Sequence, residues 1–328
     1  NHSSIMIKSG DIKLLTDPWY SGSAFNNGWS LLYENNTDTI KKILTNLDYI
    51  FISHEHPDHF SINFFKDYEE IIKVNNIKII FQTTQDKRVE KFLKKMNFKM
   101  ILLEDKERFK INAKTFVTIF KQGHIDSALL CETEDFYHLN INDCNFLKRE
   151  LLEINNFILN KNKKIIIYIQ FSYASFRAND EWLKQAALYK LNNIIKVNNI
   201  FNSTIIIPFA SFFNFSHSEN QHLTKFVNSS SIVTDFLDKN NINHCFLNPD
   251  LDMLDLSKLI KKDLIQKKIN NDSVKFWENK KANAKINFYE TDPIPIEKEN
   301  ITIFLSRIKK YNSLFLMYLI RFISFKKV

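Results

Sequence analysis

Short apolar runs alternate with polar, turn-forming segments along most of the chain. Residues 4–8 and 12–16 are two such runs, and the Ser-Gly-Asp between them is typical of a hairpin turn. Helical periodicity is clearest at residues 38–46, 86–96 and 180–196. Further runs of strand length and β-branched or aromatic composition occur at residues 47–53, 77–81, 115–120, 128–132, 137–141, 165–169 and 204–207.

This order of elements mixes hairpins with strand-helix units. It favours an α/β fold with two mixed β-sheets and helices on the outside over a single parallel, doubly wound sheet. Residues 17–33 contain several aromatic side chains and two of the chain's 4 glycines, and we expect them to form a loop. No linker or internal repeat divides residues 1–260, which we interpret as one catalytic domain.

We interpret residues 261–328 as a C-terminal extension. The part up to residue 300 is polar, and Pro293 and Pro295 mark an extended stretch within it. Residues 301–328 predict a basic, apolar helix whose longest uncharged run, residues 311–320, is too short to span a bilayer. Two interpretations remain open for this tail, namely a packing helix and an interfacial helix in peripheral contact with a membrane.

Composition excludes some classes of partner. Hydrophobic residues make up 44% of the chain and charged residues 25%, as in ordinary globular proteins. The net charge of +8 comes from scattered lysines without a nucleic-acid-binding motif, so we expect no nucleic-acid partner. Cys131, Cys144 and Cys245 are widely spaced and predict neither disulfides nor a cysteine zinc site. We expect a cytoplasmic protein whose upstream segment is missing, because the chain starts at Asn1 without a visible signal peptide.

Residues 53–60, Ser-His-Glu-His-Pro-Asp-His-Phe, carry the strongest chemical signal. With 9 His in 328 residues, three His at fixed positions arise by chance in only about 2 × 10⁻⁵ of windows. His54 and His56 follow a buried strand directly, where both imidazoles can face one ion. Asp58 and His59 come next and can face a second. Zinc, iron and manganese all accept imidazole and carboxylate ligands.

Such a motif provides only half of a two-metal site, so further ligands should follow later strands. His124 lies between two predicted strands, Asp143 comes just after a third, and His217 lies in a loop after another. Asp143 is placed where a carboxylate could bridge two ions. Together these residues predict a dinuclear metal centre.

In the identity and order of these motifs, the chain resembles the metallo-β-lactamase superfamily. The resemblance implies an αββα four-layer sandwich. It also implies that His54, His56 and His124 hold the first metal, that Asp58, His59 and His217 hold the second, and that Asp143 bridges them. Asp17, in Leu-Leu-Thr-Asp-Pro, matches an early strand-end aspartate of the family that supports the metal ligands through hydrogen bonds.

A narrower resemblance covers roughly residues 1–258. The stretches WYSGSAFNNGWSLL, ISHEHPDHFS, PFASFFNFSHSEN and LNPDLDMLDL are similar to the metallo-β-lactamase-type domain of CMP-N-acetylneuraminate hydroxylase and UDP-N-acetylmuramate hydroxylase-like proteins. Those hydroxylases also carry a Rieske iron–sulfur domain, which needs Cys-x-His ligand pairs. No such pair occurs here, so an oxygenase would receive its electrons from the missing upstream segment or from another protein, an external electron-transfer partner.

Three functions follow from this interpretation. The first is hydrolysis by hydroxide bound to two divalent metal ions, with Asp58 or Asp143 accepting a proton. The alternative is a diiron oxygenase that hydroxylates the N-acyl group of a nucleotide sugar. The third is a non-catalytic binding relative. In the first two cases the partner is a small molecule that is phosphorylated or linked to a nucleotide, and zinc, iron and manganese are the candidate metals.

Residues expected to bind the substrate come from loops at the same sheet edge. Arg177 could pair with a phosphate. His2 is open to two interpretations, a buried structural residue or a pocket residue, whereas His138, His222 and His244 are expected to be structural. The complete set of expected substrate-binding residues is Tyr20, Phe25, Asn27, Trp29, Tyr173 and Arg177.

Overall fold

The computed structural model describes residues 1–160, 162–174, 179–249, 256 and 264–284. Residues 1–287 group into one compact unit. The tail helix predicted over residues 301–328 and the predicted phosphate-binding residue Arg177 lie outside the described residues. No helix in the described part of the chain is long and apolar enough to cross a membrane.

The first sheet has five strands in the order β1-β2-β5-β6-β7. Its β1 and β2 form the predicted antiparallel hairpin, while β2, β5, β6 and β7 run parallel. Parallel strands end at the same edge of a sheet, so residues that follow β2 and β5 come close together. The strands are β1 (Met6–Ser9), β2 (Ile12–Thr16), β5 (Tyr49–Phe51), β6 (Lys78–Gln82) and β7 (Lys99–Leu103).

The second sheet has six strands in the order β13-β12-β11-β10-β9-β8. Neighbouring strands from β8 to β11 are antiparallel, and β11, β12 and β13 are parallel. Both sheets are therefore mixed. The strands are β8 (Arg108–Lys110), β9 (Phe116–Gln122), β10 (Asp126–Glu132), β11 (Phe136–Asn142), β12 (Lys164–Gln170) and β13 (Ile205–Phe209).

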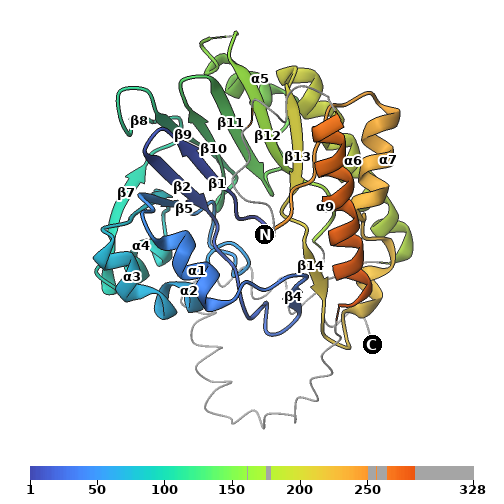
Figure 1. Cartoon of the computed structure of the whole chain (residues 1–328), viewed down its shortest axis with the longest axis horizontal. Coiled ribbons are helices and arrows are strands. Elements are labelled where there is room, and N and C mark those ends of the chain that lie inside the picture. Colours follow the sequence, from blue (N-terminus) through green and yellow to red (C-terminus); the bar gives the residue numbers. More distant parts are fainter. Residues whose placement is uncertain (161, 175–178, 250–255, 257–263, 285–328) are drawn as a thin grey trace, which may run out of the picture. The chain divides into compact units, whose positions relative to one another are not determined.

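Helices cover the outer face of each sheet (Figure 1). The first sheet is covered by α1 (Thr37–Leu44), α2 (Ile62–Asp67), α3 (Glu69–Val74) and α4 (Arg88–Lys95). The second is covered by α5 (Lys148–Asn156), α6 (Asp180–Phe201), α7 (Ser230–Lys239) and α9 (Leu264–Ala282). A short 3-10 helix, η1 (Gln221–Phe226), precedes α7.

Alternation along the strands builds the four layers. Leu14 packs in the core between the two sheets, together with Ile119 and Leu129 of the second sheet. Its neighbour Leu15 points to the opposite face and packs beneath the helices of the first sheet. This alternation is the period of two that a strand imposes on its side chains. The predicted αββα sandwich with two mixed sheets is confirmed.

The segment expected to be a loop contains additional strands. β4 (Trp29–Leu31) pairs with β3 (Ser23–Ala24) on one side and with β14 (Phe213–Phe215) on the other in a small third sheet. Stacking of the Trp29 ring on Phe213, with centroids 3.7 Å apart, accompanies the pairing. Short strands of this kind depend on a partner distant in the sequence, and the local pattern did not predict them.

The region after residue 260 is also more structured than its polar composition suggested. α9 begins at Leu264, within the expected C-terminal extension, and packs beside α7. Its Trp277 is 2% exposed and stacks on Phe212 with centroids 3.7 Å apart. The Trp277 Nε1 donates a hydrogen bond to the carbonyl oxygen of Leu247. α9 is therefore part of the same core as the second sheet.

Candidate metal centre

Three strand ends supply the polar side chains of the candidate centre. Asp17 follows β2, His54 follows β5 by three residues, and Asp143 follows β11. Asn142, directly before Asp143, adopts a positive φ of 57°, and the pairing of β11 with β12 shifts register between Asn140 and Asn142. This irregularity ends the strand and turns it toward the centre, as bulges near functional sites do.

A buried hydrogen-bond network fixes the loop that carries the histidines. Asp17 is fully buried, and its Oδ1 accepts a hydrogen bond from the backbone N–H of Ser53 at 2.7 Å. Its Oδ2 accepts from Ser53 Oγ at 2.8 Å and from Asn142 Nδ2 at 2.6 Å, and lies 3.1 Å from His59 Nδ1. This contact leaves His59 Nε2 directed toward the centre. Asp17 thus lies where a supporting residue orients a metal ligand.

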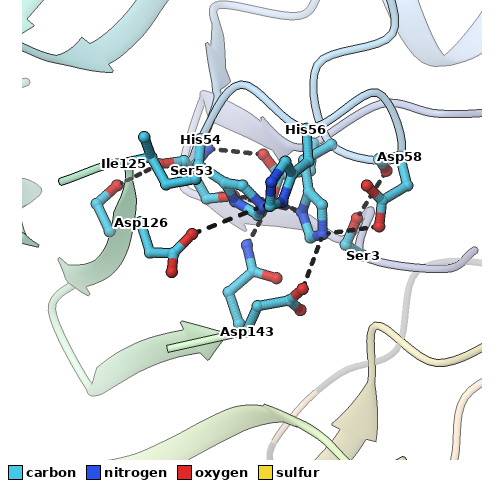
Figure 2. Close-up of polar contacts among 12 residues, drawn as sticks. Ser3, Ser53, His54, His56, Asp58, Ile125, Asp126 and Asp143 are labelled. Carbon is cyan, nitrogen blue, oxygen red and sulfur yellow. Dashed lines mark hydrogen bonds and ion pairs between the residues drawn. The ribbon is translucent and has the colours of Figure 1, made fainter. Parts of the chain in front are cut away.

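The first group of ligand atoms comes from His54, His56 and Asp126, which Figure 2 shows converging. His54 Nε2 is 2.9 Å from His56 Nδ1 and 3.8 Å from Asp126 Oδ1. The expected third ligand, His124, is instead exposed in the turn between β9 and β10 and joins no metal-binding group among the described residues. Asp126, the first residue of β10, occupies the place expected for it.

The second group is centred on His59. Its Nε2 lies 3.2 Å from Asp58 Oδ2 and 3.5 Å from Asp143 Oδ2. Asp143 also groups with His54, so its carboxylate lies between ligand atoms of both groups, as a bridging ligand would. His2 completes a set with Asp58 and His59, because its Nε2 lies 3.3 Å from Asp58 Oδ2. Asp58 and His59 belong to the turn before α2 and not to the helix itself.

Charges at the centre favour metal-binding protonation states of His54 and Asp58, whereas they oppose them at His59 and Asp126 as long as no cation is bound. Burial lowers the pKa of His54 to about 3, so its imidazole is neutral at physiological pH and can bind through a lone pair. Burial opposes ionisation of Asp58, but the neighbouring His59 outweighs it and the pKa of Asp58 falls well below its usual value. Burial likewise acts against a charged His59, but Asp58 and Asp143 outweigh it and raise its pKa. Burial raises the pKa of Asp126.

Unpaired buried atoms at the centre test whether a cation would fit. Asp58 Oδ1 and Asp143 Oδ1 are buried without a hydrogen-bond partner. Leaving such atoms unpaired costs about 1–3 kcal/mol each, and more for charged groups. Both are carboxylate oxygens, which zinc, iron and manganese accept as ligands. The residues present therefore fit a pair of divalent cations.

His217 stands apart from these groups. It lies half-buried in the loop after β14, where its Nδ1 accepts a hydrogen bond from the backbone N–H of Glu219. It belongs to none of the metal-binding groups found among the described residues. The structure brings together five of the seven ligands expected from the sequence and the supporting Asp17, and it places Asp126 rather than His124 beside His54 and His56. These six are Asp17, His54, His56, Asp58, His59 and Asp143.

Of the residues expected to bind substrate, Phe25 lies nearest a ligand. Its ring centroid is 5.9 Å from that of His56, and the side chain is 40% exposed. Trp29 is buried behind it, with ring centroids 4.6 Å apart. Asn27 accepts a hydrogen bond from Ser23 Oγ and so stabilises the turn that presents Phe25. Among the expected substrate-binding residues that the structure describes, Phe25 is therefore the one positioned for direct contact with a substrate at His56.

The two tyrosines expected to bind substrate are buried core residues instead. Tyr173 is buried, and its hydroxyl donates to the carbonyl oxygen of Leu223. Tyr20 is also buried, with its hydroxyl 2.7 Å from Ser4 Oγ. It lines a cavity of about 660 Å³ that His2 also lines, behind Asp58. His2 is thus both buried and in a pocket, so the two interpretations of it were not exclusive.

The remaining histidines lie away from the centre. His138 is buried on β11, with its Nδ1 2.9 Å from the Tyr168 hydroxyl. His244 is buried and its Nδ1 donates to the carbonyl oxygen of Ile242, whereas His222 is exposed in η1. None of them joins a metal-binding group among the described residues, as expected.

Sequence reasoning missed Asp126 although it lies two residues after His124. An acidic residue at the start of a strand is too common to stand out beside a histidine. It also missed Asn142, which precedes Asp143 and holds Asp17, and Lys190 on α6, whose charge acts on Asp143 and Asp126. No local pattern distinguishes Lys190 from the other lysines of the chain.

Comparison with known proteins identifies the fold. Residues 1–128 match the family model of the β-lactamase superfamily domain. Cytidine monophosphate-N-acetylneuraminic acid hydroxylase of Asterias rubens is 47% identical over 58 residues, which are 18% of this chain and 9% of that protein. The Sus scrofa protein of the same name is 43% identical over 60 residues, which are 18% of this chain and 14% of that protein. The matches thus span a small part of these relatives.

Solved structures of low sequence identity share the fold. CmlA, a diiron β-hydroxylase from Streptomyces venezuelae, is 12% identical with a TM-score of 0.51, over 74% of this chain and 51% of that one. A possible metal-dependent hydrolase from Veillonella parvula is 12% identical with a TM-score of 0.55, over 76% of this chain and 94% of that one. The fold therefore occurs in a diiron hydroxylase and in a possible metal-dependent hydrolase. The chain has the metallo-β-lactamase fold, and its residues 1–128 match the β-lactamase superfamily domain.

Proposed function

We propose that this protein is a dinuclear metalloenzyme and that it hydroxylates its substrate with two iron ions. The observation that carries the proposal is Asp126. With Asp126 in place of His124, the first group of ligands consists of two imidazoles and one carboxylate. That set, with open positions left for other ligands, is typical of non-haem iron(II) oxygenases. On this ground we place the oxygenase before the hydrolase, whereas from the sequence alone we placed the hydrolase first.

In this proposal each residue has a defined role. His54, His56 and Asp126 hold one ion, and Asp58 and His59 hold the other, with Asp143 between them. The contact of His59 Nδ1 with Asp17 keeps Nε2 directed at its ion. Iron supplies the one-electron chemistry needed to use dioxygen. One oxygen atom enters a C–H bond, the other leaves as water, and an external reductant supplies two electrons and two protons.

The match to the hydroxylases also supports the substrate class. Their name specifies a cytidine monophosphate-linked N-acetylated sugar acid. We propose a nucleotide-linked or phosphorylated sugar with an N-acyl group for this chain. Residues 1–328 contain no Cys-x-His pair for a Rieske cluster, so the electrons would come from outside these residues.

Hydrolysis is the second candidate. Two imidazoles and a carboxylate also hold catalytic zinc, with a water in the open position. His56 is exposed and Asp126 only half-buried, so a water at the first ion could reach a substrate. In this case the ions would lower the pKa of the shared water and the ligands would keep the same roles.

Metal loading followed by product analysis distinguishes the two candidates. The protein is prepared without oxygen and loaded with iron or with zinc. The iron form is then given dioxygen, a chemical reductant and CMP-N-acetylneuraminate, and the zinc form is given esters, lactones and phosphodiesters. A sugar product that has gained one oxygen atom supports the hydroxylase. Turnover by the zinc form alone would overturn it, and Asp143→Ala should abolish either activity.

A further inference from the structure

Lys190 of α6 is linked to the candidate metal centre through one asparagine. Its Nζ donates a hydrogen bond to Asn145 Oδ1 at 3.1 Å. Asn145 Nδ2 in turn donates to the backbone carbonyl oxygen of Asp143 at 3.1 Å. Asn145 therefore holds the ammonium group close to the carboxylate that lies between the two ligand groups.

The ammonium group of Lys190 is close to two ligands without being paired to either. It interacts electrostatically with Asp143 and Asp126, yet no carboxylate oxygen of the described residues lies within 4 Å of it. An ammonium has three N–H donors, and the amide oxygen of Asn145 uses one. The other donors are therefore available to a ligand. Burial lowers the pKa of Lys190, and Asp143 opposes that shift.

Charge balance indicates what kind of ligand this would be. Two divalent cations would balance the carboxylates of Asp58, Asp126, Asp143 and the buried Asp17 that contacts His59, and Lys190 adds one positive charge in excess. A partly desolvated site with this excess attracts an anion, and charge-assisted hydrogen bonds from an ammonium are stronger than neutral ones. A lysine that has no carboxylate partner in such a site can bind an anion that enters from solution.

We propose that Lys190 binds an anionic group of the substrate, a phosphate or a carboxylate, and thereby selects anionic substrates. The proposal rests on the dinuclear site proposed above and adds the residue that determines specificity. Phe25, against His56, provides an exposed apolar surface for another part of the same molecule. Asn145 positions Lys190 and does not itself contact the substrate.

A purely structural role for Lys190 makes a different prediction. If its charge only offset Asp143 and Asp126, its removal would change how tightly the metals bind and leave anion binding per loaded site unchanged. Metal content and anion affinity must therefore be measured on the same protein samples.

The test uses inorganic phosphate and acetate as probes of the metal-loaded protein. Affinities are measured by calorimetry, and metal content by elemental analysis, for the wild type, Lys190→Gln and Lys190→Arg. The control is Lys184→Gln, an exposed lysine of the same helix. We expect Lys190→Gln to retain both metals and to bind one of the anions about tenfold more weakly, as loss of a charge-assisted hydrogen bond predicts. Lys190→Arg should retain most of the affinity and Lys184→Gln all of it.

The anion with the larger loss identifies the group that Lys190 binds. A fully metal-loaded Lys190→Gln protein with unchanged affinity for both anions would overturn the role of Lys190 while leaving the dinuclear site intact. Loss of metal in Lys190→Gln with no further loss of anion affinity would overturn it in favour of the structural role. A wild-type protein that takes up no metal would instead contradict the proposed function on which this inference rests.

Discussion

Asp126 Oδ1 lies 3.8 Å from His54 Nε2, whereas His124, two residues earlier, points into solvent from the turn of the same hairpin. β10 begins at Asp126, which pairs with Gln122 of β9. Strand geometry therefore sets the direction of the Asp126 side chain, and the turn residues before it are left exposed. A carboxylate in place of an imidazole changes both the charge of the first ligand group and the metals that suit it.

Replacing Asp126 should therefore affect the metal centre, and replacing His124 should not. We expect Asp126→Asn to lower the metal content of the purified protein from two ions per chain toward one, because an amide is a weaker ligand than a carboxylate. His124→Gln should retain both ions. Elemental analysis of the two variants, prepared side by side, measures this. The reverse pattern would restore His124 as the third ligand of the first ion.

Asp17 should influence metal affinity without contacting a metal. Its Oδ2 accepts hydrogen bonds from Ser53 and Asn142 and contacts His59. In Asp17→Asn an NH2 group replaces one carboxylate oxygen. Its N–H groups face the donor groups of Ser53 and Asn142, and the contact that orients the His59 ring is lost. We expect metal affinity to fall about 10–100-fold, as for other supporting residues. Competition with a chelator measures the affinity, and Asp38→Asn on the exposed side of α1 is the control. An unchanged affinity would contradict the role of Asp17.

Stability should depend on pH through His138. Burial lowers the pKa of His138 to about 4, whereas histidine in an unfolded chain titrates near 6.5. The unfolded state therefore takes up the proton first as the pH falls. The contribution of a neutral His138 to stability is complete above about pH 6.5 and is lost progressively between 6.5 and 4, at about 1.4 kcal/mol per pH unit.

Urea unfolding of metal-free protein at pH 7.5 and 4.5 measures this dependence. Between the two pH values, His138→Gln should lose about 3 kcal/mol less of its free energy of unfolding than the wild type does. Glutamine retains a polar group opposite the Tyr168 hydroxyl. His222→Gln, at an exposed position, should show the wild-type loss. Equal losses in all three proteins would show that His138 does not couple folding to pH.

Trp277 tests whether α9 belongs to the catalytic domain. The ring is 2% exposed and stacks on Phe212, so Trp277→Ala leaves a cavity in the core. We expect the free energy of unfolding to fall by about 3–5 kcal/mol. Trp182→Ala is the matched control, because that ring is 49% exposed on α6. If both variants lost the same small amount, α9 would not be part of the folding unit.

Sequence reasoning predicted the parts of the centre that depend on neighbours in the chain. His54, His56, Asp58 and His59 form one short turn after a buried strand, so their convergence follows from local geometry. Asp143 was found because it follows a predicted strand, and Asp17 because its segment matches the family that the chain resembles. The strands themselves were recognisable from alternation and from their β-branched residues. Element boundaries differed by a few residues, as in α6, which continues to Phe201.

Other features required the tertiary structure. The pairing of β4 with β14 joins segments that lie far apart in the sequence, and a two-residue strand such as β3 has no periodicity to detect. Asp126 replaces His124 because of hairpin register, which depends on pairing with β9. Lys190 reaches the centre only because α6 packs beside α5 and the loop that contains Asn145.

The sequence by itself determined the fold class, the four residues of the histidine motif and the supporting aspartate. Those features arise from periodicity and short spacing, which are local properties of a chain. The tertiary structure decided that Asp126 and not His124 lies beside His54 and His56, that Lys190 is linked to Asp143 through Asn145, and that α9 belongs to the core. Each of these features depends on how segments distant in the sequence pack together. The direction of a side chain at the end of a strand is set by the strand with which it pairs.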